Sequence, residues 1–307
     1  MERPTIKSPT ELEYMREAGL VVAAIHQALI DATKPGVTTA QLDQVVANVV
    51  ADAGAKPNFL HYQGFPATVC ISVNDEVVHG IPGQRALQLG DIVSYDCGAY
   101  VVRAGKKWHG DAAVTVVVGD THIPDAQFAQ GIHPEGEVGG VSPVTLSRRR
   151  TLSSVTRGSM WAGIAAAATA KRTNDVAAAI EDFVEAEGAA IQADQGWSPE
   201  IIEGYTGHGI GTHLHEDPTV YNYRTRGRSG KLVAGMAICI EPMVIAGDST
   251  SAVLDDEWTV VTVEGTDAAH WEHTVAIGKH GISVLTAPDA GAAGLAPFGI
   301  TPIRSFV

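Results

Sequence analysis

Cysteine is scarce in this chain, with three in 307 residues at positions far apart in the sequence. Three distant cysteines indicate neither a disulfide framework nor a zinc ribbon, so the fold has to depend on an ordinary hydrophobic core. Hydrophobic residues make up 45% of the chain, which is typical of a soluble globular protein. The length is enough for one large domain or two small ones.

Positive charge is also in short supply, because 21 Lys and Arg stand against 35 Asp and Glu and give a formal net charge of −14. A broad nucleic-acid surface needs a basic stripe, so we expect no dedicated nucleic-acid site. The sequence has no apolar run of the roughly 20 residues that cross a bilayer, and no basic-then-apolar signal region at its start. We therefore expect a cytoplasmic protein without a membrane partner, and we take it to be a monomer.

Capping signals predict two helices in the first part of the chain. Ser8 and Glu11 are spaced as a capping box, which begins a helix over residues 9–32. Thr38 and Gln41 give a second such start, for a helix over 38–54. The runs that follow are rich in β-branched residues and predict strands at 68–73, 77–80, 91–102 and 112–118.

The second part of the chain repeats this order of elements. Residues 121–150 lack any sustained period and contain several Gly and Pro, so we interpret them as a loop insertion. Two helices and a group of strands are then predicted, at 152–170, 174–188, 237–245, 258–263 and 269–277. Helices followed by strands thus occur twice, which suggests two similar halves. We expect the Gly- and Ala-rich tail, 287–307, to be loosely attached.

The run Arg148–Arg150 closes the expected insertion. We interpret it as a solvated basic turn, and a transient ribosome contact is the alternative. Phosphate contacts would make that alternative strongly dependent on salt.

Five possible metal ligands stand in strand-like or glycine-rich contexts, namely Asp96, Asp111, His208, Glu241 and Glu272. Two-metal hydrolytic sites use bridging carboxylates to hold two divalent cations about 3.5–4 Å apart. Carboxylates with a single imidazole suit Mn, Fe, Co or Zn. Asp96 and Asp111 lie in or beside strands that we expect to pair, so both carboxylates can face one side of a sheet. The pattern predicts a hydrolytic two-metal centre.

Nine short segments, in this order, resemble the methionine aminopeptidases, specifically the bacterial type I enzymes. They are Tyr62–Pro66, Val69–Asn74, Val78–Pro82, Gly90–Asp96, His109–Asp111, Gly207–Gly211, His215-Glu216, Ile240–Pro242 and Trp271–Thr274. The resemblance implies an α/β (α+β) pita-bread fold, in which pseudo-twofold halves share a central curved antiparallel sheet flanked by helices. We expect a single peptidase domain over residues 1–286, followed by the tail.

The resemblance also implies a reaction, the removal of the N-terminal methionine from nascent proteins whose second residue is small. A hydroxide that bridges two divalent ions would attack the first peptide bond. Asp111 and Glu272 resemble the bridging ligands, His208 and Glu241 the ligands of one ion, and Asp96 a ligand of the other. Glu241 would also carry the proton to the leaving amine.

The substrate contacts are implied in the same way. The residues that match them are His79 and His215 as the two unliganded histidines, and Tyr62, Phe65, Cys70 and Trp258 as the lining of the methionine pocket. Three residues depart from the family pattern and affect the shape of the pocket rather than the metal ligands. They are Phe59, Gln63 and Leu214.

Other activities remain open at this stage. A proline-directed aminopeptidase shares the fold, but such enzymes carry a large extra N-terminal domain, for which we see no room before Ser8. A non-catalytic pita-bread protein that binds a partner, or a metal-free creatinase-like hydrolase, would be expected to lack some of the five ligands. The sequence does not choose among Co, Mn, Fe and Zn.

Overall fold

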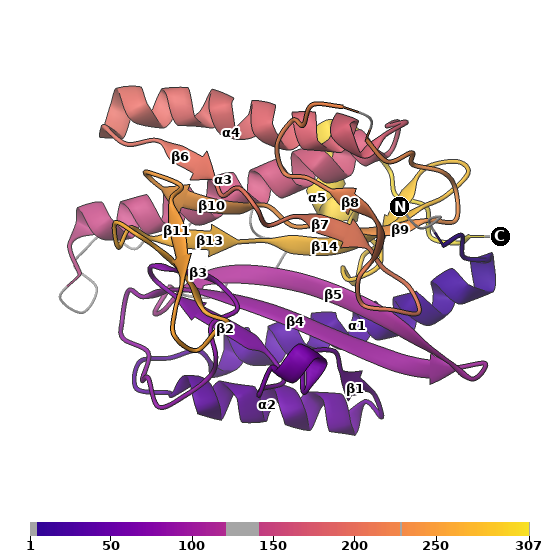
Figure 1. The fold of residues 1–307 in the computed structure, drawn as a ribbon, viewed down its shortest axis with the longest axis horizontal. Coiled ribbons are helices and arrows are strands. Elements are labelled where there is room, and N and C mark those ends of the chain that lie inside the picture. Colours follow the sequence, from indigo (N-terminus) through magenta and orange to yellow (C-terminus); the bar gives the residue numbers. More distant parts are fainter. Residues whose placement is uncertain (1–4, 121–140, 228, 307) are drawn as a thin grey trace.

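A large curved antiparallel sheet runs through the centre of the molecule, with helices along both of its sides (Figure 1). The structure is a computed structural model, and it describes residues 5–120, 141–227 and 229–306. The sheet order is β1-β4-β5-β14-β9-β7-β8, with β15 beside β14 and β2 beside β4. These strands are β1 (Lys56–Pro57), β2 (Cys70–Val73), β4 (Ile92–Arg103), β5 (Lys106–Val117), β7 (Gly207–Gly209), β8 (Glu216–Val220), β9 (Ala237–Ile240), β14 (Glu272–Ile277) and β15 (Ile282–Val284).

Two small sheets of three strands each lie beside the large one. Their orders are β13-β10-β6 and β11-β12-β3. The strands are β3 (Glu76–Val78), β6 (Pro199–Ile201), β10 (Met243–Ala246), β11 (Ser251–Val253), β12 (Val260–Thr262) and β13 (Ala268–His270).

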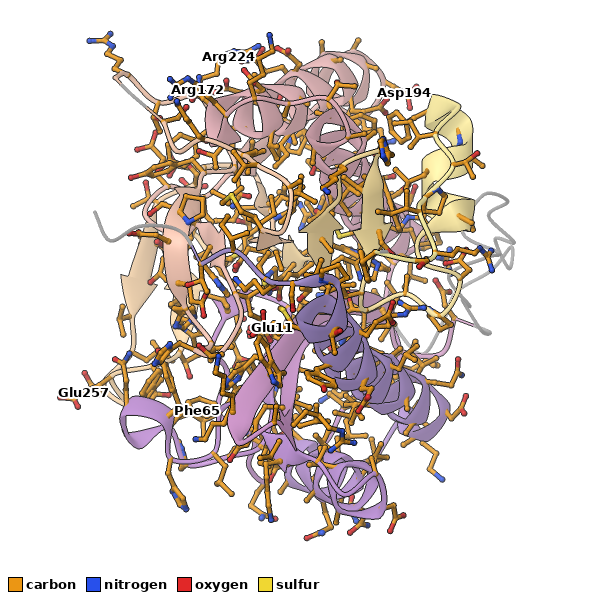
Figure 2. All side chains as sticks on the ribbon, turned by 90° about the vertical axis from the view of Figure 1, so that its right-hand side faces the viewer. Glu11, Phe65, Arg172, Asp194, Arg224 and Glu257 are labelled. Atoms are coloured by element: carbon orange, nitrogen blue, oxygen red, sulfur yellow. The ribbon has the colours of Figure 1, made fainter. Side chains whose placement is uncertain are left out.

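The four long helices fall into two pairs, one for each half of the chain (Figure 1). Helix α1 packs on β4 and β5 and also contacts α2, whereas α3 packs on α4 and contacts β10, β13 and β14. Seen from the side, strands lie between α1, which begins near Glu11, and the pair α3 and α4 (Figure 2). The helices are α1 (Pro9–Ala32), α2 (Thr39–Asp52), α3 (Pro143–Ala167), α4 (Thr173–Gln195) and α5 (Ala292–Leu295), with short 3₁₀ turns η1 (Tyr62–Gly64) and η3 (Ala296–Phe298).

Both predicted helix starts of the first half are confirmed. The Ser8 hydroxyl accepts a hydrogen bond from the Glu11 backbone N–H at 3.3 Å, and the Glu11 carboxylate accepts one from the Ser8 N–H at 2.9 Å. Thr38 and Gln41 make the same reciprocal pair at the start of α2. None of the helices among the described residues is long and apolar enough to cross a membrane.

The prediction of a loop insertion over residues 121–150 is wrong for its last residues, because these form the start of a helix. Residues 121–140 lie outside the described residues, but α3 begins at Pro143, where the Ser142 hydroxyl accepts from the Thr145 N–H at 3.1 Å. The sequence Ser142-Pro143 is the same start signal as Ser8-Pro9. We missed it because several polar residues follow and hide the helical period.

The basic run is therefore not a solvated turn. Arg149 donates to Asp267 and to the Gly90 carbonyl, and Arg150 pairs with Asp120. The side chains of Arg149 and Arg150 are only 11% and 15% exposed. These two guanidinium groups are therefore engaged within the protein, which weakens the ribosome-contact alternative. Exposed arginines occur elsewhere, as at Arg224 on the outer edge beside α4 (Figure 2).

Two predicted strands are each divided between two sheets. The run 237–245 breaks after Ile240 into β9 and β10, and the run 269–277 breaks at Trp271 into β13 and β14. Strands β9 and β14 belong to the large sheet, while β10 and β13 belong to a small one. Periodicity did not reveal these breaks, because the residues on both sides of each break are buried.

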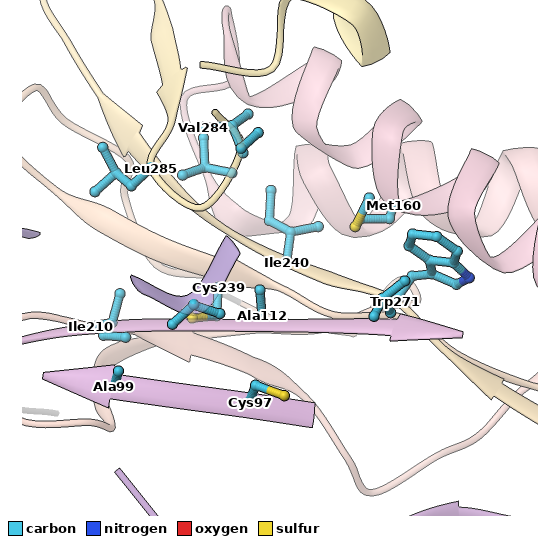
Figure 3. Close-up of a cluster of buried hydrophobic side chains, with 14 of the residues drawn as sticks. Cys97, Ala99, Ala112, Met160, Ile210, Cys239, Ile240, Trp271, Val284 and Leu285 are labelled. Carbon is cyan, nitrogen blue, oxygen red and sulfur yellow. The ribbon is translucent and has the colours of Figure 1, made fainter. Parts of the chain in front are cut away.

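The core lies between the large sheet and the helices on either side. A cluster of buried residues joins Cys97 of β4, Ile240 of β9 and Met160 of α3 (Figure 3). The tail also contributes, contrary to our expectation that it is loosely attached. Leu295 is fully buried, and the Ile303 N–H donates to the Ile282 carbonyl at 2.8 Å.

Candidate active site

Four of the five expected ligands lie on neighbouring strands of the large sheet, and the fifth directly follows another of its strands. In sheet order, Asp96 is on β4, Asp111 on β5, Glu272 on β14, Glu241 directly after β9, and His208 on β7. Residues far apart in the sequence thus become neighbours across successive strands.

The register shows that the first three of these carboxylates share one face. Asp96 lies opposite Ala113, and Ala113 lies opposite Glu272 on the next strand. Asp111 is two residues before Ala113, and residues two apart on a strand point to the same side. The expected pairing of the two Asp-bearing strands is therefore confirmed. One detail was wrong, since β5 begins at Lys106 and Asp111 lies in its middle.

The glycines on either side of His208 allow β7 to fit between its neighbours. A Cβ atom at Gly207 would lie 2.3 Å from the Cys239 carbonyl oxygen, and one at Gly209 would lie 2.1 Å from the Asp217 carbonyl oxygen. His208 Nδ1 is 2.9 Å from the Gly209 carbonyl oxygen, to which it can only donate. Its Nε2 is then left as a lone-pair donor, the form that binds metals.

Burial and the neighbouring charges alter the pKa values of the candidate ligands. His208 Nε2 is 3.4 Å from Glu241 Oε1 and 4.0 Å from Asp111 Oδ2. Burial raises the pKa of Asp96 to about 7. Burial, followed by the charges of neighbouring carboxylates, raises the pKa values of Asp111, Glu241 and Glu272 well above their ordinary range. Burial also lowers the pKa of His208 to about 3, so its imidazole is neutral.

Each of the four carboxylates has one buried oxygen without a hydrogen-bond partner among the described residues. These atoms are Asp96 Oδ1, Asp111 Oδ1, Glu241 Oε1 and Glu272 Oε1. An unpaired buried polar atom costs about 1–3 kcal/mol, and more when it is charged. Divalent cations would satisfy the oxygens and offset the repulsion, so these residues fit a metal centre.

The possible ligand atoms form two groups that share Glu272. One group joins Asp111, His208 and Glu272 with Cys239, and the other joins Glu241 and Glu272 with His270; within each group the atoms lie within 4.8 Å of one another. Asp96 is in neither group.

Cys239 and His270 were missed by the sequence analysis. Each stands two positions before an expected ligand, and the two-residue period of strands is the signal that could have found them. Burial, followed by the nearby carboxylates, raises the pKa of the Cys239 thiol well above its ordinary value, so this side chain is a neutral thiol.

The expected substrate contacts gather beside the carboxylates. Tyr62 Oη is 2.7 Å from His215 Nδ1, and the His215 ring is 4.4 Å from the His208 ring. The Trp258 ring lies 5.1 Å from Phe65 and 6.0 Å from His79.

Two further observations concern this region. Cys70 lies opposite Asp96 in the β2–β4 register. His79 has a positive φ of 62°, a backbone conformation that is uncommon outside glycine and is often found at functional sites.

A cavity of about 540 Å³ is lined in part by Tyr62 and His215. Its wall includes Tyr100, Lys107 and Leu214. Of the residues that depart from the family pattern, Leu214 is thus on the cavity wall and buried, and Phe59 is also buried, whereas Gln63 is exposed with a φ of 49°.

Comparison with known proteins identifies the class first. The model of metallopeptidase family M24 matches residues 13–279, so the chain belongs to that family of metal-dependent hydrolases. Within it, the chain is 43% identical to methionine aminopeptidase 1 of Mycobacterium tuberculosis, over 91% of this chain and 94% of that protein. It is 38% identical to methionine aminopeptidase 1 of Bacillus subtilis, over 91% and 98%. These relatives confirm the expected enzyme, a metal-dependent methionine aminopeptidase.

Solved structures confirm the expected pita-bread fold. The methionine aminopeptidase of Thermotoga maritima aligns with a TM-score of 0.77 at 36% identity, over 93% of this chain and all of that one. The prolidase of Pyrococcus furiosus aligns with a TM-score of 0.63 at 19% identity, which indicates a shared fold alone, and the chain covers 65% of it.

Proposed function

We propose that the five residues on neighbouring strands hold two divalent ions, with which the protein removes the first methionine from nascent chains that have a small second residue. The observation that carries the proposal is that four carboxylates, each with one buried and unpaired oxygen, lie on or beside neighbouring strands together with one neutral imidazole. We propose further that the enzyme acts as a monomer in the cytoplasm, where nascent chains emerge.

The ligand roles are those that the family resemblance implies, and the positions in the sheet support them. Asp111 and Glu272 lie on the central strands β5 and β14 and would bridge the two ions. His208 and Glu241 would complete the coordination of one ion, and Asp96 on β4 would complete that of the other. When bound, a pair of Co, Mn, Fe or Zn ions would lower the pKa of a bound water and polarise the scissile carbonyl.

Two histidines are suited to hold the substrate. Burial lowers the pKa of His79 to about 4 and also lowers that of His215, so both rings are neutral near pH 7. If the Tyr62 hydroxyl donates to His215 Nδ1, the ring proton is on Nε2, from which it can donate to the developing oxyanion. His79 would contact the free amine of the substrate, and Glu241 would carry a proton to the leaving amine.

The first side chain of the substrate would enter an apolar, sulfur-tolerant pocket. Phe65 and Cys70 are buried, Trp258 lies edge-on to Phe65, and the Tyr62 hydroxyl lies 2.7 Å from His215 Nδ1. Aromatic rings contact a methionine sulfur favourably. The rest of the substrate chain would lie in the 540 Å³ cavity that Tyr62 and His215 help to line.

The test is to remove all metal, restore Mn, Fe, Co or Zn one at a time, and measure methionine release from a Met-Ala-Ser peptide. We expect no release without metal and release with at least one of the four. A peptide with proline in second place and a large first residue should not be cut, which separates this activity from that of a proline-directed enzyme. If no metal restores release, the protein is a non-catalytic member of the fold.

A further inference from the structure

His270 is a buried side chain that the proposed reaction does not use. It is 1% exposed, and neither of its ring nitrogens has a hydrogen-bond partner among the described residues. A buried polar group without a partner is costly, so it usually has a partner or a function. His270 therefore needs an explanation that packing does not supply.

The backbone of His270 is firmly held, which fixes the position of its ring. Its N–H lies within hydrogen-bond distance of the Ser94 and Thr115 hydroxyls, at 3.2 and 3.0 Å. Its carbonyl accepts from the Thr115 hydroxyl at 2.7 Å. These contacts tie the end of β13 to β4 and β5.

Glu241, by contrast, is held only through its main chain. The Asn222 amide donates to the Glu241 carbonyl at 3.1 Å, but no hydrogen bond to the side chain is found among the described residues. Its two oxygens face different imidazoles. Oε1 is 3.4 Å from His208 Nε2, and Oε2 is 3.9 Å from His270 Nε2.

Both residues lie where the chain passes between sheets. Glu241 separates β9 of the large sheet from β10 of a small one, and His270 ends β13 just before β14 returns to the large sheet. Met243 and His270 are direct partners in the β10–β13 pair. The two crossings therefore bring His270 close to Glu241, with Oε2 towards His270 and Oε1 towards His208.

We propose that His270 is a positioning residue of the metal centre, whose Nε2–H donates to Glu241 Oε2 and so directs Oε1 towards the ion that His208 binds. A movement of about 1 Å brings the pair to hydrogen-bonding distance. A carboxylate oxygen has two lone pairs, so Oε2 can still accept the proton that Glu241 carries. The proposal rests on the metal centre proposed above.

The decisive variants are His270→Gln, which keeps an N–H donor, and His270→Leu, which has none. The readout is metal affinity, measured by calorimetric titration of the metal-free proteins with Mn or Zn. Loss of an outer partner of a metal ligand typically weakens metal binding about 10–100-fold. We expect that loss for His270→Leu and a change below about 3-fold for His270→Gln.

His26→Leu is the matched control. His26 is a partly buried histidine on α1, which packs on this sheet, but its ring contacts the Ala112 carbonyl at 3.1 Å rather than a carboxylate. We expect its metal affinity to stay within about 3-fold of the original. An equal loss in His26→Leu would mean that any buried histidine change disturbs the site, which would overturn the specific role of His270.

Two other outcomes would also overturn the proposal. Unchanged affinity in His270→Leu would show that the hydrogen bond has no effect. Equal weakening in His270→Gln and His270→Leu would show that the imidazole itself is required, as a direct ligand. Failure of the original protein to bind metal would instead refute the proposed function, so the two failures are distinguishable.

A measurement on the unchanged protein covers the case in which His270→Leu does not fold. Nitrogen-15 NMR of labelled histidines in the zinc-loaded enzyme separates a protonated Nε2 from a metal-bound one. The resonance that disappears in His270→Gln identifies His270 among the 12 histidines. We expect a proton on its Nε2, and a zinc-bound Nε2 would overturn the proposal.

Discussion

The protein has two buried clusters of charged side chains, which differ in whether cationic side chains neutralise their carboxylates. At the start of α3, both oxygens of Asp267 accept from arginines, Arg149 at 2.8 Å and Arg148 at 3.3 Å. In the large sheet, four carboxylates have no cationic side chain among the described residues close enough to form an ion pair, only neutral histidines. The chain itself neutralises the first cluster, whereas the second has the composition of the metal centre proposed above.

This difference separates a structural cluster from a functional one. A buried charge is stable only with a partner, whether that partner is a side chain or a metal. Substitutions in the arginine cluster should therefore affect folding, and substitutions in the carboxylate cluster should affect activity. The following predictions test that separation, beginning with the largest effect.

Asp111→Asn should abolish activity while leaving the fold intact. The amide removes a charge that both ions need, and removal of such a group typically lowers activity on the order of 10³-fold or more. Methionine release from Met-Ala-Ser is the measurement. Without metal, the variant should unfold at a higher temperature than the original protein, because one repelling carboxylate has been neutralised. Retention of full activity would refute the two-metal assignment.

Asp267→Asn should lower the stability of the protein and leave its activity nearly unchanged. Breaking a buried ion pair typically costs about 3–5 kcal/mol, and we expect the lower value because Arg148 is partly exposed. The free energy of unfolding from urea titration should fall by about 3 kcal/mol. Activity per folded molecule should stay within about 2-fold. A large loss of activity at unchanged stability would remove the distinction between the two clusters.

The stability of the metal-free protein should depend on pH through the carboxylate cluster. The folded-state pKa of Asp96 is raised to about 7, above its ordinary value of 3.8, so the folded protein binds more protons between those values. The free energy of unfolding should therefore fall as the pH rises from about 4 to about 7. Thermal unfolding with and without metal is the measurement, and saturating metal should reverse the trend. A metal-free protein that becomes more stable over this range would contradict the assigned burial.

The sequence predicted the two clusters to different extents. The five expected ligands could be proposed from the sequence because each lies in a short motif, and the pairing of the strands of Asp96 and Asp111 followed from their β-branched runs. The arginine cluster was misinterpreted, because nothing in Arg148–Arg150 indicates that Asp120 and Asp267 come to lie beside it. Long-range partners of this kind depend on the completed fold.

Contacts within the candidate active site also depend on the completed fold. His270 stands two residues before Glu272, yet its position against Glu241 depends on two strands changing sheets, at Glu241-Pro242 and at Trp271. An apolar run does not show where a strand leaves one sheet for another. The expected ligands could therefore be proposed from the sequence, whereas the position of His270 beside Glu241 could not.

The smallest predicted effect concerns the cap that begins α3. The Ser142 hydroxyl accepts from the Thr145 N–H, and removal of such a cap costs typically about 1 kcal/mol. Ser142→Ala should lower the free energy of unfolding by that amount, as should Ser8→Ala at the start of α1. Only Ser142→Ala should also loosen the first turns of α3, so hydrogen exchange at Arg149 and Arg150 should quicken in that variant alone. Because the carboxylate cluster takes no ligand from α3, methionine release should remain unchanged in both variants. A fall in metal affinity on Ser142→Ala would show that the two clusters are coupled, and the contrast between them would then have to be abandoned.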